Sequence, residues 1–268
     1  MKDEYPQHEA NRAMWNAQAT AWARGTDARG LWRRCHQDPS LALCPTERAL
    51  LGTIAGRETC VLGSGDNEAV FALAGMGALV TSVDISDAQL DIARARAESL
   101  SLEVRFVRSD VCILTDLADE SFDVVYTGGH ISVWISDLRR YYAEAVRILR
   151  PHGLFLVNDY HPTRRMWHDS QGPAPAHRYF DRGPYRYVSE EGLPQYEYHW
   201  TTTDHVQAML DAGCTLVKIE EDGEGEEEGA HAAMVPADLP RSLLLGGRKM
   251  GGGAVDRPEP ESRGAPCR

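Results

Sequence analysis

Short apolar segments alternate with amphipathic stretches from residue 59 to residue 247 of the chain. Several segments are apolar at every position, which is the pattern of strands buried on both faces of a sheet. Strands that alternate with helices along a chain are typical of a parallel sheet covered by helices. The pattern predicts an α/β fold with seven candidate strands, at Thr59–Leu62, Leu79–Asp84, Glu103–Val107, Phe122–Thr127, Gly153–Asn158, Thr215–Glu220 and Ser242–Gly246.

Three of the amphipathic stretches predict helices with recognisable ends. Ser86 precedes the first, and Gln89 follows three positions later, which is the spacing of a capping box. The second covers Asp137–Leu149 and is expected to stop before Pro151, because a proline disfavours helical geometry in the residue before it. The third covers Thr203–Ala212 and is followed by a glycine, the residue that best tolerates a left-handed helix cap.

Two segments do not follow this alternation. Residues 1–58 are expected to form a helical cap on a single domain that spans residues 1–249. Trp15 and Trp22 lie seven positions apart on one face of the cap. That face either packs on the domain as an amphipathic helix or forms a flap over a ligand. Residues 162–200 form an insertion on the expected substrate side, and long insertions often carry substrate contacts.

The composition is that of a globular protein, with 43% apolar and 25% charged residues. The 28 basic and 40 acidic residues give a net charge of −12, which repels a phosphate backbone, so we expect no nucleic-acid partner. No apolar run approaches the roughly 18 residues of a membrane span, and the first residues are polar. We therefore expect no membrane association, no secretory signal and a cytoplasmic location.

The remaining features argue for packing and solvation. Six cysteines have no C-x-x-C pair and no nearby histidine spacing, so we expect reduced packing residues and no metal site. They are Cys35, Cys44, Cys60, Cys112, Cys214 and Cys267. The acidic run at residues 220–228 is interpreted as a solvated loop, and the polar, glycine-rich residues 250–268 as a disordered tail.

A turn with two glycines follows the first predicted strand. It reads Gly63-Ser64-Gly65, so the backbone can approach a ligand closely at the carboxyl edge of the sheet. Asp84 ends the next strand about 20 residues later, where an acid can accept hydrogen bonds from ribose hydroxyls. Asp110 follows the third strand, where it either accepts from an adenine amino group or caps a helix. A nucleoside-containing cofactor is therefore expected.

With these features the sequence resembles the class I S-adenosylmethionine (SAM)-dependent methyltransferases over Thr59–Gly247. The resemblance rests on the order and spacing of VLGSGDNEAVFALAGMGALVTSVDIS, RFVRSDV, SFDVVYTGGH and YYAEAVRILRPHGLFLVN. It implies a Rossmann-like, seven-stranded, mostly parallel sheet with helices on both faces and an antiparallel last strand. It also implies SAM as cofactor and S-adenosylhomocysteine as product. The cofactor-binding residues expected on this basis are Gly63, Ser64, Gly65, Asp84, Ile85, Asp110, Val111 and Thr127.

The sequence departs from the family pattern in the cofactor turn. Asn67 stands at the usual third glycine, and we expect it to keep the turn because asparagine tolerates left-handed backbone geometry. Val61 stands at the position of the usual acid, which leaves the contact to the methionyl amine unassigned. A dinucleotide cofactor is the competing interpretation, but Glu68 would repel a pyrophosphate and no Tyr-x-x-x-Lys pair is present.

Methyl transfer requires a nucleophile held in line with the methyl group, and a general base is needed only for some acceptors. The acceptor is expected beyond the carboxyl ends of the fourth and fifth strands. His130 there can take a proton from a phenol, amine or indole, or can simply cap a helix. The candidate catalytic residues are Tyr126, His130, Asp159 and His161.

Aromatic residues are frequent in and near the insertion. Tyr196, Tyr198 and Trp200 would share one face of a strand, and they either form a lid over a flat substrate or belong to a small hairpin. The candidate substrate-contacting residues are Trp134, Tyr160, Trp167, Tyr179, Tyr196, Tyr198 and Trp200.

Three functions agree with these observations. The leading hypothesis is a SAM-dependent methyltransferase for a small-molecule acceptor, such as an aromatic natural product or an amine, with methylation on oxygen, nitrogen or carbon. The second is an RNA or protein methyltransferase, which the net charge of −12 disfavours. The third is a protein that binds a nucleoside cofactor without catalysis. The sequence does not define the oligomeric state.

Overall fold

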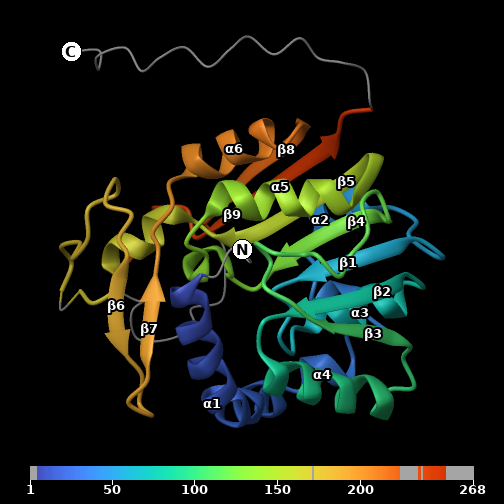
Figure 1. Cartoon of the computed structure of the whole chain (residues 1–268), viewed down its shortest axis with the longest axis horizontal. Coiled ribbons are helices and arrows are strands. Elements are labelled where there is room, and N and C mark those ends of the chain that lie inside the picture. Colours follow the sequence, from blue (N-terminus) through green and yellow to red (C-terminus); the bar gives the residue numbers. More distant parts are fainter. Residues whose placement is uncertain (1–4, 171, 224–234, 237, 252–268) are drawn as a thin grey trace.

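A seven-stranded sheet runs through the centre of the molecule in the computed structural model, which describes residues 5–170, 172–223, 235–236 and 238–251 (Figure 1). The strand order is β3-β2-β1-β4-β5-β9-β8, and only β9 runs antiparallel to its neighbours. The expected mostly parallel sheet with an antiparallel last strand is confirmed. The strands are β1 (Glu58–Leu62), β2 (Leu79–Asp84), β3 (Val104–Arg108), β4 (Phe122–Gly128), β5 (Leu149–Tyr160), β8 (Cys214–Asp222) and β9 (Ser242–Lys249).

Helices cover both faces of the sheet, and each face has its own hydrophobic core. On one face α5 (Leu138–Ile148) and α6 (Thr202–Asp211) pack against β4, β5 and β9. On the other face lie α2 (Pro45–Leu51), α3 (Glu68–Gly75) and α4 (Asp87–Ser99). The central strands are therefore enclosed on both sides, which explains why their sequences are apolar throughout.

The helix starts follow the predicted capping residues, with one correction. The Ser86 side chain accepts a hydrogen bond from the Gln89 backbone N–H at 3.2 Å. The reciprocal bond of a capping box is not formed here, and the buried Gln89 Oε1 has no hydrogen-bond partner among the described residues. Gln89 instead lines a cavity at the edge of the sheet. A full capping box is formed at α6, where Thr201 and Asp204 satisfy each other.

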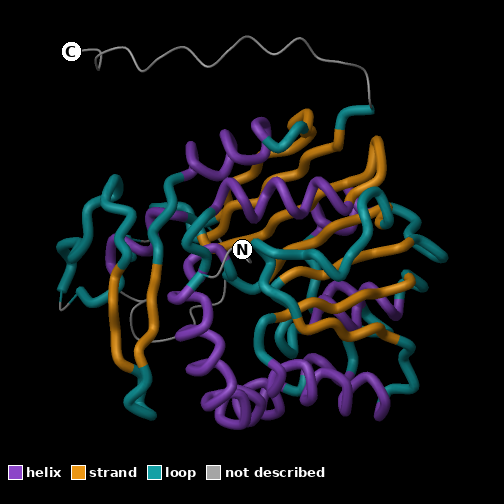
Figure 2. Tube along the Cα trace, in the orientation of Figure 1, coloured by secondary structure: helices purple, strands orange, loops and turns teal. Residues whose placement is uncertain are grey.

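Two elements lie outside this sandwich, α1 (Pro6–Arg29) and the hairpin of β6 (Tyr185–Val188) and β7 (Pro194–Glu197) (Figure 1, Figure 2). Figure 2 shows α1 between the hairpin and the rest of the chain. Asn11 connects them, because its amide donates to the Tyr196 carbonyl at 2.9 Å and accepts from the Tyr196 N–H at 2.8 Å. The insertion therefore contains the small hairpin that its alternation allowed, and the hairpin packs against α1.

Predictions for the acidic run and the tail are only partly covered by the described residues. Glu220 and Asp222 belong to β8, so the start of the acidic run is strand and not loop. Residues 224–228 of that run and residues 252–268 of the tail lie outside the described residues. Within the described part of the chain, no helix is both long enough and apolar enough to cross a membrane.

Candidate active site

A cavity of about 350 Å³ opens at the carboxyl ends of β1, β2 and β4, and α1 lies across it. This is the edge at which open α/β sheets bind ligands. The lining residues used below are His8, Asn11, Trp15, Trp22, Arg29, Gly63, Ser64, Gly65, Asp66, Asn67, Glu68, Asp84, Ile85, Gln89, Asp110, Val111, Tyr126, His130 and Trp134.

The glycine turn forms the floor of this cavity. Gly63 and Gly65 have φ angles of +59° and +46°, which favour glycine. A Cβ atom on Gly63 would lie 2.6 Å from the Ile131 side chain, so no larger residue fits. Asn67 has φ −60° and is the N-cap of α3, with its side chain accepting from the Ala69 N–H. Asn67 keeps the turn through its N–H bond to the Ser64 carbonyl, but as an N-cap and not through left-handed geometry, because the helix begins one residue later.

Asp84 is held at the end of β2 by two backbone donors. Its Oδ2 accepts from the Gly65 N–H and its Oδ1 from the Ser86 N–H, both at 2.8 Å. Burial raises the pKa of Asp84 to about 6, although these hydrogen bonds oppose the shift. Gln89, whose Oε1 has no hydrogen-bond partner among the described residues, lies next to this carboxylate across Gly65. The two side chains form a polar patch that suits a diol ligand.

Asp110 lies beneath the start of α1. His8 Nδ1 donates to its Oδ2 at 2.7 Å, and the Cys112 N–H donates to its Oδ1 at 2.9 Å. The Ser136 N–H donates to His8 Nε2 at 2.8 Å, so this nitrogen carries no proton and the proton lies on Nδ1. Asp110 lines the cavity and also fixes the N-terminal end of α1.

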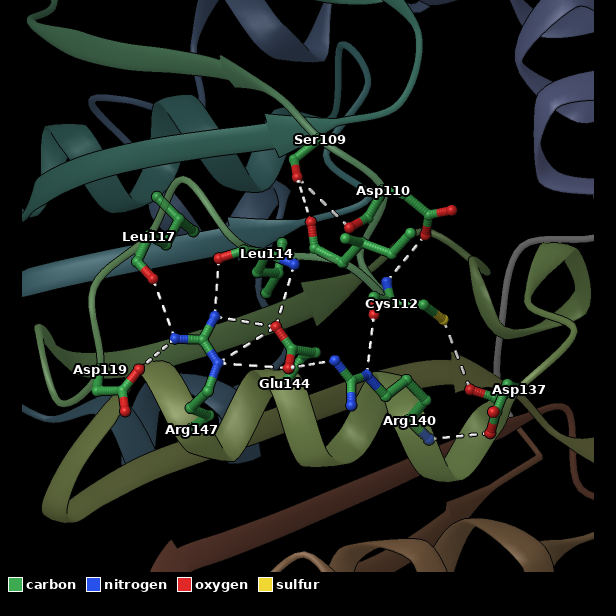
Figure 3. A network of polar contacts seen from close by, with 11 residues as sticks. Ser109, Asp110, Cys112, Leu114, Leu117, Asp119, Asp137, Arg140, Glu144 and Arg147 are labelled. Atoms are coloured by element: carbon green, nitrogen blue, oxygen red, sulfur yellow. Dashed lines mark hydrogen bonds and ion pairs between the residues drawn. The ribbon is translucent and has the colours of Figure 1, made fainter. Parts of the chain in front are cut away.

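The loop that follows Asp110 is fixed by a polar network on α5 (Figure 3). Glu144 accepts from the Leu114 N–H at 3.1 Å, and Arg147 donates to the Leu114 and Leu117 carbonyls at 2.7 and 3.1 Å. Arg140 donates to the Cys112 carbonyl at 3.2 Å. These bonds satisfy backbone groups of a loop without secondary structure and thereby position the Asp110 carboxylate.

The C-terminal half of α1 is fixed by a buried ion pair beside the glycine turn. Asp66 and Arg96 are 3% and 5% exposed, and Arg96 Nη1 contacts Asp66 Oδ2 at 2.5 Å. Trp22 and Thr26 of α1 both donate to the same carboxylate at 3.0 Å. Arg96 also donates to the Thr26 hydroxyl at 2.7 Å. The helix is therefore joined to the cofactor turn through a desolvated charge pair.

Glu68 and Arg29 form a second charged pair in the cavity. Glu68 is the first residue of α3, its side chain is 17% exposed, and its Oε1 lies 3.8 Å from Arg29 Nη2. Burial raises the pKa of Glu68, and the positive charge of Arg29 opposes this shift. Glu68 Oε1 has no hydrogen-bond partner among the described residues. The pair offers one acidic and one basic group close to the glycine turn. Val61, which stands at the position of the usual acid, lies in β1 just before that turn.

His130 faces the cavity with a carboxylate behind it. Its φ angle is +71°, 36% of its side-chain surface remains accessible, and its Nδ1 lies 3.7 Å from Asp159 Oδ1. Burial lowers the pKa of His130, and the Asp159 carboxylate opposes this shift. Burial would raise the pKa of Asp159, but His130 and the Ser132 N–H outweigh it and hold the pKa below its usual value. The pair is therefore a neutral imidazole backed by an anionic carboxylate at neutral pH.

Three other predicted residues have different partners. The Tyr126 hydroxyl donates to Glu47 at 2.8 Å, although the ring lines the cavity. Thr127 is fully buried and hydrogen-bonded to Tyr141 on the α5 face, because successive side chains of a strand point to opposite faces. His161 contacts Glu221 at 2.8 Å instead of Asp159 and is outside the cavity lining. Thr127 therefore does not reach the cavity, contrary to its expected contact with a cofactor, and the catalytic candidate His161 lies outside the cavity lining.

The aromatic residues of the insertion do not form the predicted lid over this cavity. Of the candidate substrate-contacting residues, only Trp134 belongs to the cavity lining. Tyr160 stacks on the His130 ring and is not part of the lining. The other five lie outside the lining and contact the insertion itself, α1, α6 or the loop after β4: Trp167, Tyr179, Tyr196, Tyr198 and Trp200. Tyr198 and Trp200 stack on each other, with ring centroids 6.2 Å apart.

The aromatic wall comes mainly from α1. Trp15 lies edge-on to Trp22 and to Trp134, with ring centroids 5.7 and 5.4 Å apart. The sequence signal for this wall was the spacing of Trp15 and Trp22, seven residues apart on one helix face. Both tryptophans line the cavity. Sequence reasoning missed His8, Arg29 and Gln89, because a single polar residue on a helix has no distinctive spacing.

Comparisons with known proteins find one matching family and several relatives of this chain. Residues 61–157 match the family described as a methyltransferase domain. The chain is 31% identical over 117 residues to a demethylmenaquinone methyltransferase of Tropheryma whipplei, covering 43% of this chain and 47% of that protein. It is 31% identical over 101 residues to a ubiquinone biosynthesis O-methyltransferase of Coxiella burnetii, covering 38% and 42%. The chain thus spans about half the length of these curated relatives.

A solved structure agrees at the level of the fold. An S-adenosylmethionine-dependent methyltransferase from Mesorhizobium loti superimposes with a TM-score of 0.57 at 23% identity, covering 76% of this chain and 96% of that one. The predicted resemblance to class I methyltransferases is therefore confirmed, by the family match in residues 61–157 and by the fold.

Proposed function

We propose that this protein is a SAM-dependent methyltransferase that acts on a small, flat acceptor with a phenol, amine or indole group. The observation that carries the proposal is one cavity in which a glycine floor, the Asp84 carboxylate and aromatic walls converge. When bound, SAM supplies an electrophilic methyl group on a sulfonium. All other steps depend on how the chain positions the acceptor and its proton.

The cofactor is assigned to the polar half of the cavity. Asp84 and Gln89, whose buried amide oxygen has no hydrogen-bond partner among the described residues, would accept from the ribose hydroxyls. Asp110 would hold the adenine, with Ile85 and Val111 as the apolar residues beside the base. Ser64 shapes the glycine turn, since its hydroxyl is hydrogen-bonded to Ser82, its backbone N–H to the Val83 carbonyl and its carbonyl to the Asn67 N–H.

Glu68 and Arg29 are assigned to the amino-acid end of the cofactor. An ammonium group is stabilised by a buried carboxylate, and a carboxylate by a guanidinium. Glu68 thereby takes over the role of the acid that Val61 replaces, from the next turn of the chain instead of from β1. This arrangement also disfavours a dinucleotide, because Glu68 lines the cavity where a pyrophosphate would need donors.

His130 is assigned as the general base. A neutral imidazole at pH 7 accepts the proton of the acceptor while the new bond to carbon forms. Asp159 lies behind the ring, outside the cavity lining, and stabilises the imidazolium that results, so it is a positioning residue. Tyr126 takes no part in this proton transfer, because its hydroxyl is bonded to Glu47 and burial raises its pKa well above the usual value.

The acceptor is assigned to the aromatic wall of Trp15, Trp22 and Trp134. Ring faces at right angles to one another suit an aromatic or cationic guest. The names of the two curated relatives refer to quinones, which supports a ring-shaped acceptor. The net charge of −12 argues against an RNA acceptor.

The proposal is tested by isothermal titration with S-adenosylhomocysteine and by methyl transfer to a panel of phenols, amines and indoles. We expect the wild type to bind S-adenosylhomocysteine. Asp84→Ala should weaken its affinity about 100-fold, because the variant loses roughly two charge-assisted hydrogen bonds to the ligand. Asp91→Ala is the matched control, because Asp91 is 72% exposed on α4 away from the cavity. Absence of binding refutes the cofactor assignment, and binding without turnover on any acceptor supports a non-catalytic protein instead.

The base is tested separately with His130→Gln over a range of pH. We expect the wild-type rate on a phenol to fall as the pH drops through the lowered pKa of His130, since only the neutral ring accepts a proton. His130→Gln should lose this pH dependence and most of the rate. An unchanged profile would leave positioning alone as the source of catalysis.

A further inference from the structure

A cluster of two histidines and an aspartate lies in the insertion, outside the cavity described above. His168 Nδ1 is 3.4 Å from Asp169 Oδ1, and His177 Nε2 is 3.2 Å from Asp169 Oδ2. The three ligand atoms all lie within 4.8 Å of one another. The function proposed for the cavity gives these residues no role.

These separations are those of ligands around one small ion. Zinc binds imidazole nitrogen and carboxylate oxygen at about 2.0–2.2 Å, so neighbouring ligands of a tetrahedron are roughly 3.3–3.5 Å apart. The donor set also excludes other classes of cation. Calcium and magnesium prefer oxygen ligands throughout, whereas two imidazoles with one carboxylate suit zinc and its neighbours.

The surroundings hold these side chains in place and leave an approach from solvent. The His177 N–H donates to the Met166 carbonyl at 3.0 Å, which closes the loop next to His168. The Tyr187 hydroxyl donates to Asp169 Oδ2 at 2.7 Å, as an outer hydrogen bond to a ligating carboxylate would. The Asp169 side chain is 42% exposed and those of the histidines 23% and 14%, so an ion can enter.

A third histidine lies beside His177. His199 is 5% exposed, and its ring lies edge-on to that of His177, with centroids 5.1 Å apart. Neither ring nitrogen has a hydrogen-bond partner among the described residues, and the Nε2 lies 3.7 Å from Glu197 Oε2 as an ion-pair contact. A water on an ion at the neighbouring cluster would supply a hydrogen bond that this buried ring lacks.

We propose that His168, Asp169 and His177 bind one divalent transition-metal ion of the zinc type, with a water in the fourth position next to His199. The ion joins the loop after η4 (Pro162–Trp167) to the hairpin strand β6 through the Asp169–Tyr187 hydrogen bond. It thereby stabilises the insertion and takes no part in methyl transfer.

The test is titration of the chelator-treated full chain with Zn²⁺, followed by the same titration with Co²⁺ and its visible absorption. We expect one ion per chain and a tetrahedral Co²⁺ spectrum without a thiolate charge-transfer band. His168→Gln and His177→Gln should each lower the affinity at least about 10–100-fold, and His152→Asn, which changes an exposed histidine elsewhere, should leave it unchanged. Zn²⁺ should also raise the Tm of the wild type and not of the two variants.

Two results would overturn the proposal. One is the absence of saturable binding to the wild-type chain, in which case the cluster is held by hydrogen bonds alone. The other is wild-type affinity in both glutamine variants, which would place the ion elsewhere. A thiolate band with Co²⁺ would identify that other place as His8, Asp110 and Cys112, which also lie close together. Circular dichroism of the variants verifies that they are folded.

Discussion

The helix α1 and the insertion at residues 162–200 both lie outside the sheet and both are rich in aromatic residues, but they use them differently. α1 directs Trp15 and Trp22 to the cavity, where Trp15 contacts both Trp22 and Trp134. The insertion packs its aromatic rings on each other, as in the stack of Tyr185 on His199 with centroids 4.2 Å apart. The number of aromatic residues in a segment therefore does not show which segment lines the cavity.

The difference arises from how each segment is attached. α1 is joined to the cofactor edge at both ends, by His8 to Asp110 and by Trp22 to Asp66. The insertion leaves the sheet after β5 and reaches α1 through Asn11. The insertion also reaches the loop after β4, where the Tyr198 N–H donates to the Val133 carbonyl at 2.7 Å, but its aromatic rings remain outside the cavity lining.

The largest effect is expected on the attachment of α1. Arg96→Met should lower the free energy of unfolding by about 3–5 kcal/mol, because it leaves the Asp66 charge buried without its cation. Arg182→Met removes an ion pair of the insertion, but Arg182 is 42% exposed, so we expect at most about 1 kcal/mol. Urea unfolding measures both. Equal losses would show that the two segments are attached equally firmly.

The next effect concerns the N-terminal end of α1. His8→Ala removes a charge-assisted hydrogen bond to Asp110, worth about 1.5–3 kcal/mol, and exposes the adenine end of the cavity. S-adenosylhomocysteine should dissociate at least about tenfold faster, as followed by stopped-flow tryptophan fluorescence. The matched change in the insertion is Tyr187→Phe, which removes a hydrogen bond to Asp169. If Tyr187→Phe accelerates dissociation to the same extent, the insertion also covers the cofactor.

A smaller effect separates the two sets of aromatic rings. Trp15→Ala should raise the KM of an aromatic acceptor about tenfold, because ring contacts beyond simple burial contribute about 0.5–1.5 kcal/mol each. Trp167→Phe in the insertion should leave KM unchanged, since Trp167 lies outside the cavity lining. Steady-state kinetics with a saturating cofactor provide both values. The reverse result would restore the insertion as the substrate lid.

The smallest effect is a pH dependence on the α1 side of the molecule. The pKa of Asp84 is raised to about 6, so its carboxylate is ionised at pH 7 and becomes protonated as the pH falls through that value. Affinity for S-adenosylhomocysteine should therefore be about fivefold weaker at pH 5 than at pH 7.5, because the neutral acid accepts weaker hydrogen bonds. Asp84→Asn should bind weakly at both pH values. A wild-type affinity that does not change with pH would contradict the ribose assignment.

The sheet and the cofactor edge were accessible from the sequence because their signals are local. The apolar strands, Ser86 at the start of α4 and the two glycines after β1 each follow from the geometry of a few neighbouring residues. Asn67 shows the limit of this reasoning. Its tolerance of left-handed geometry was correct chemistry for the residue, but the start of α3 at the next position required an N-cap instead.

The site residues also divide into those that local sequence signals located and those that they did not. Asp84 and Asp110 were found because a strand end fixes the place of the residue that follows it. Thr127 follows the cavity residue Tyr126 but points to the opposite face of β4, and His161, just past the end of β5, contacts Glu221. Adjacent positions in a strand point to opposite faces, so sequence proximity does not predict contact.

The sequence by itself determined the order of strands and helices along the chain, the two glycines and two acids that follow the first three strands, and the absence of the usual acid at Val61. Only the tertiary structure decided that α1 covers the cavity, that Glu68 and Arg29 meet there, and that His168 and His177 flank one carboxylate. The physical reason is the distance along the chain over which each effect acts. Periodicity and capping act over a few residues, whereas these contacts join segments whose relative positions are set by the burial of the whole core.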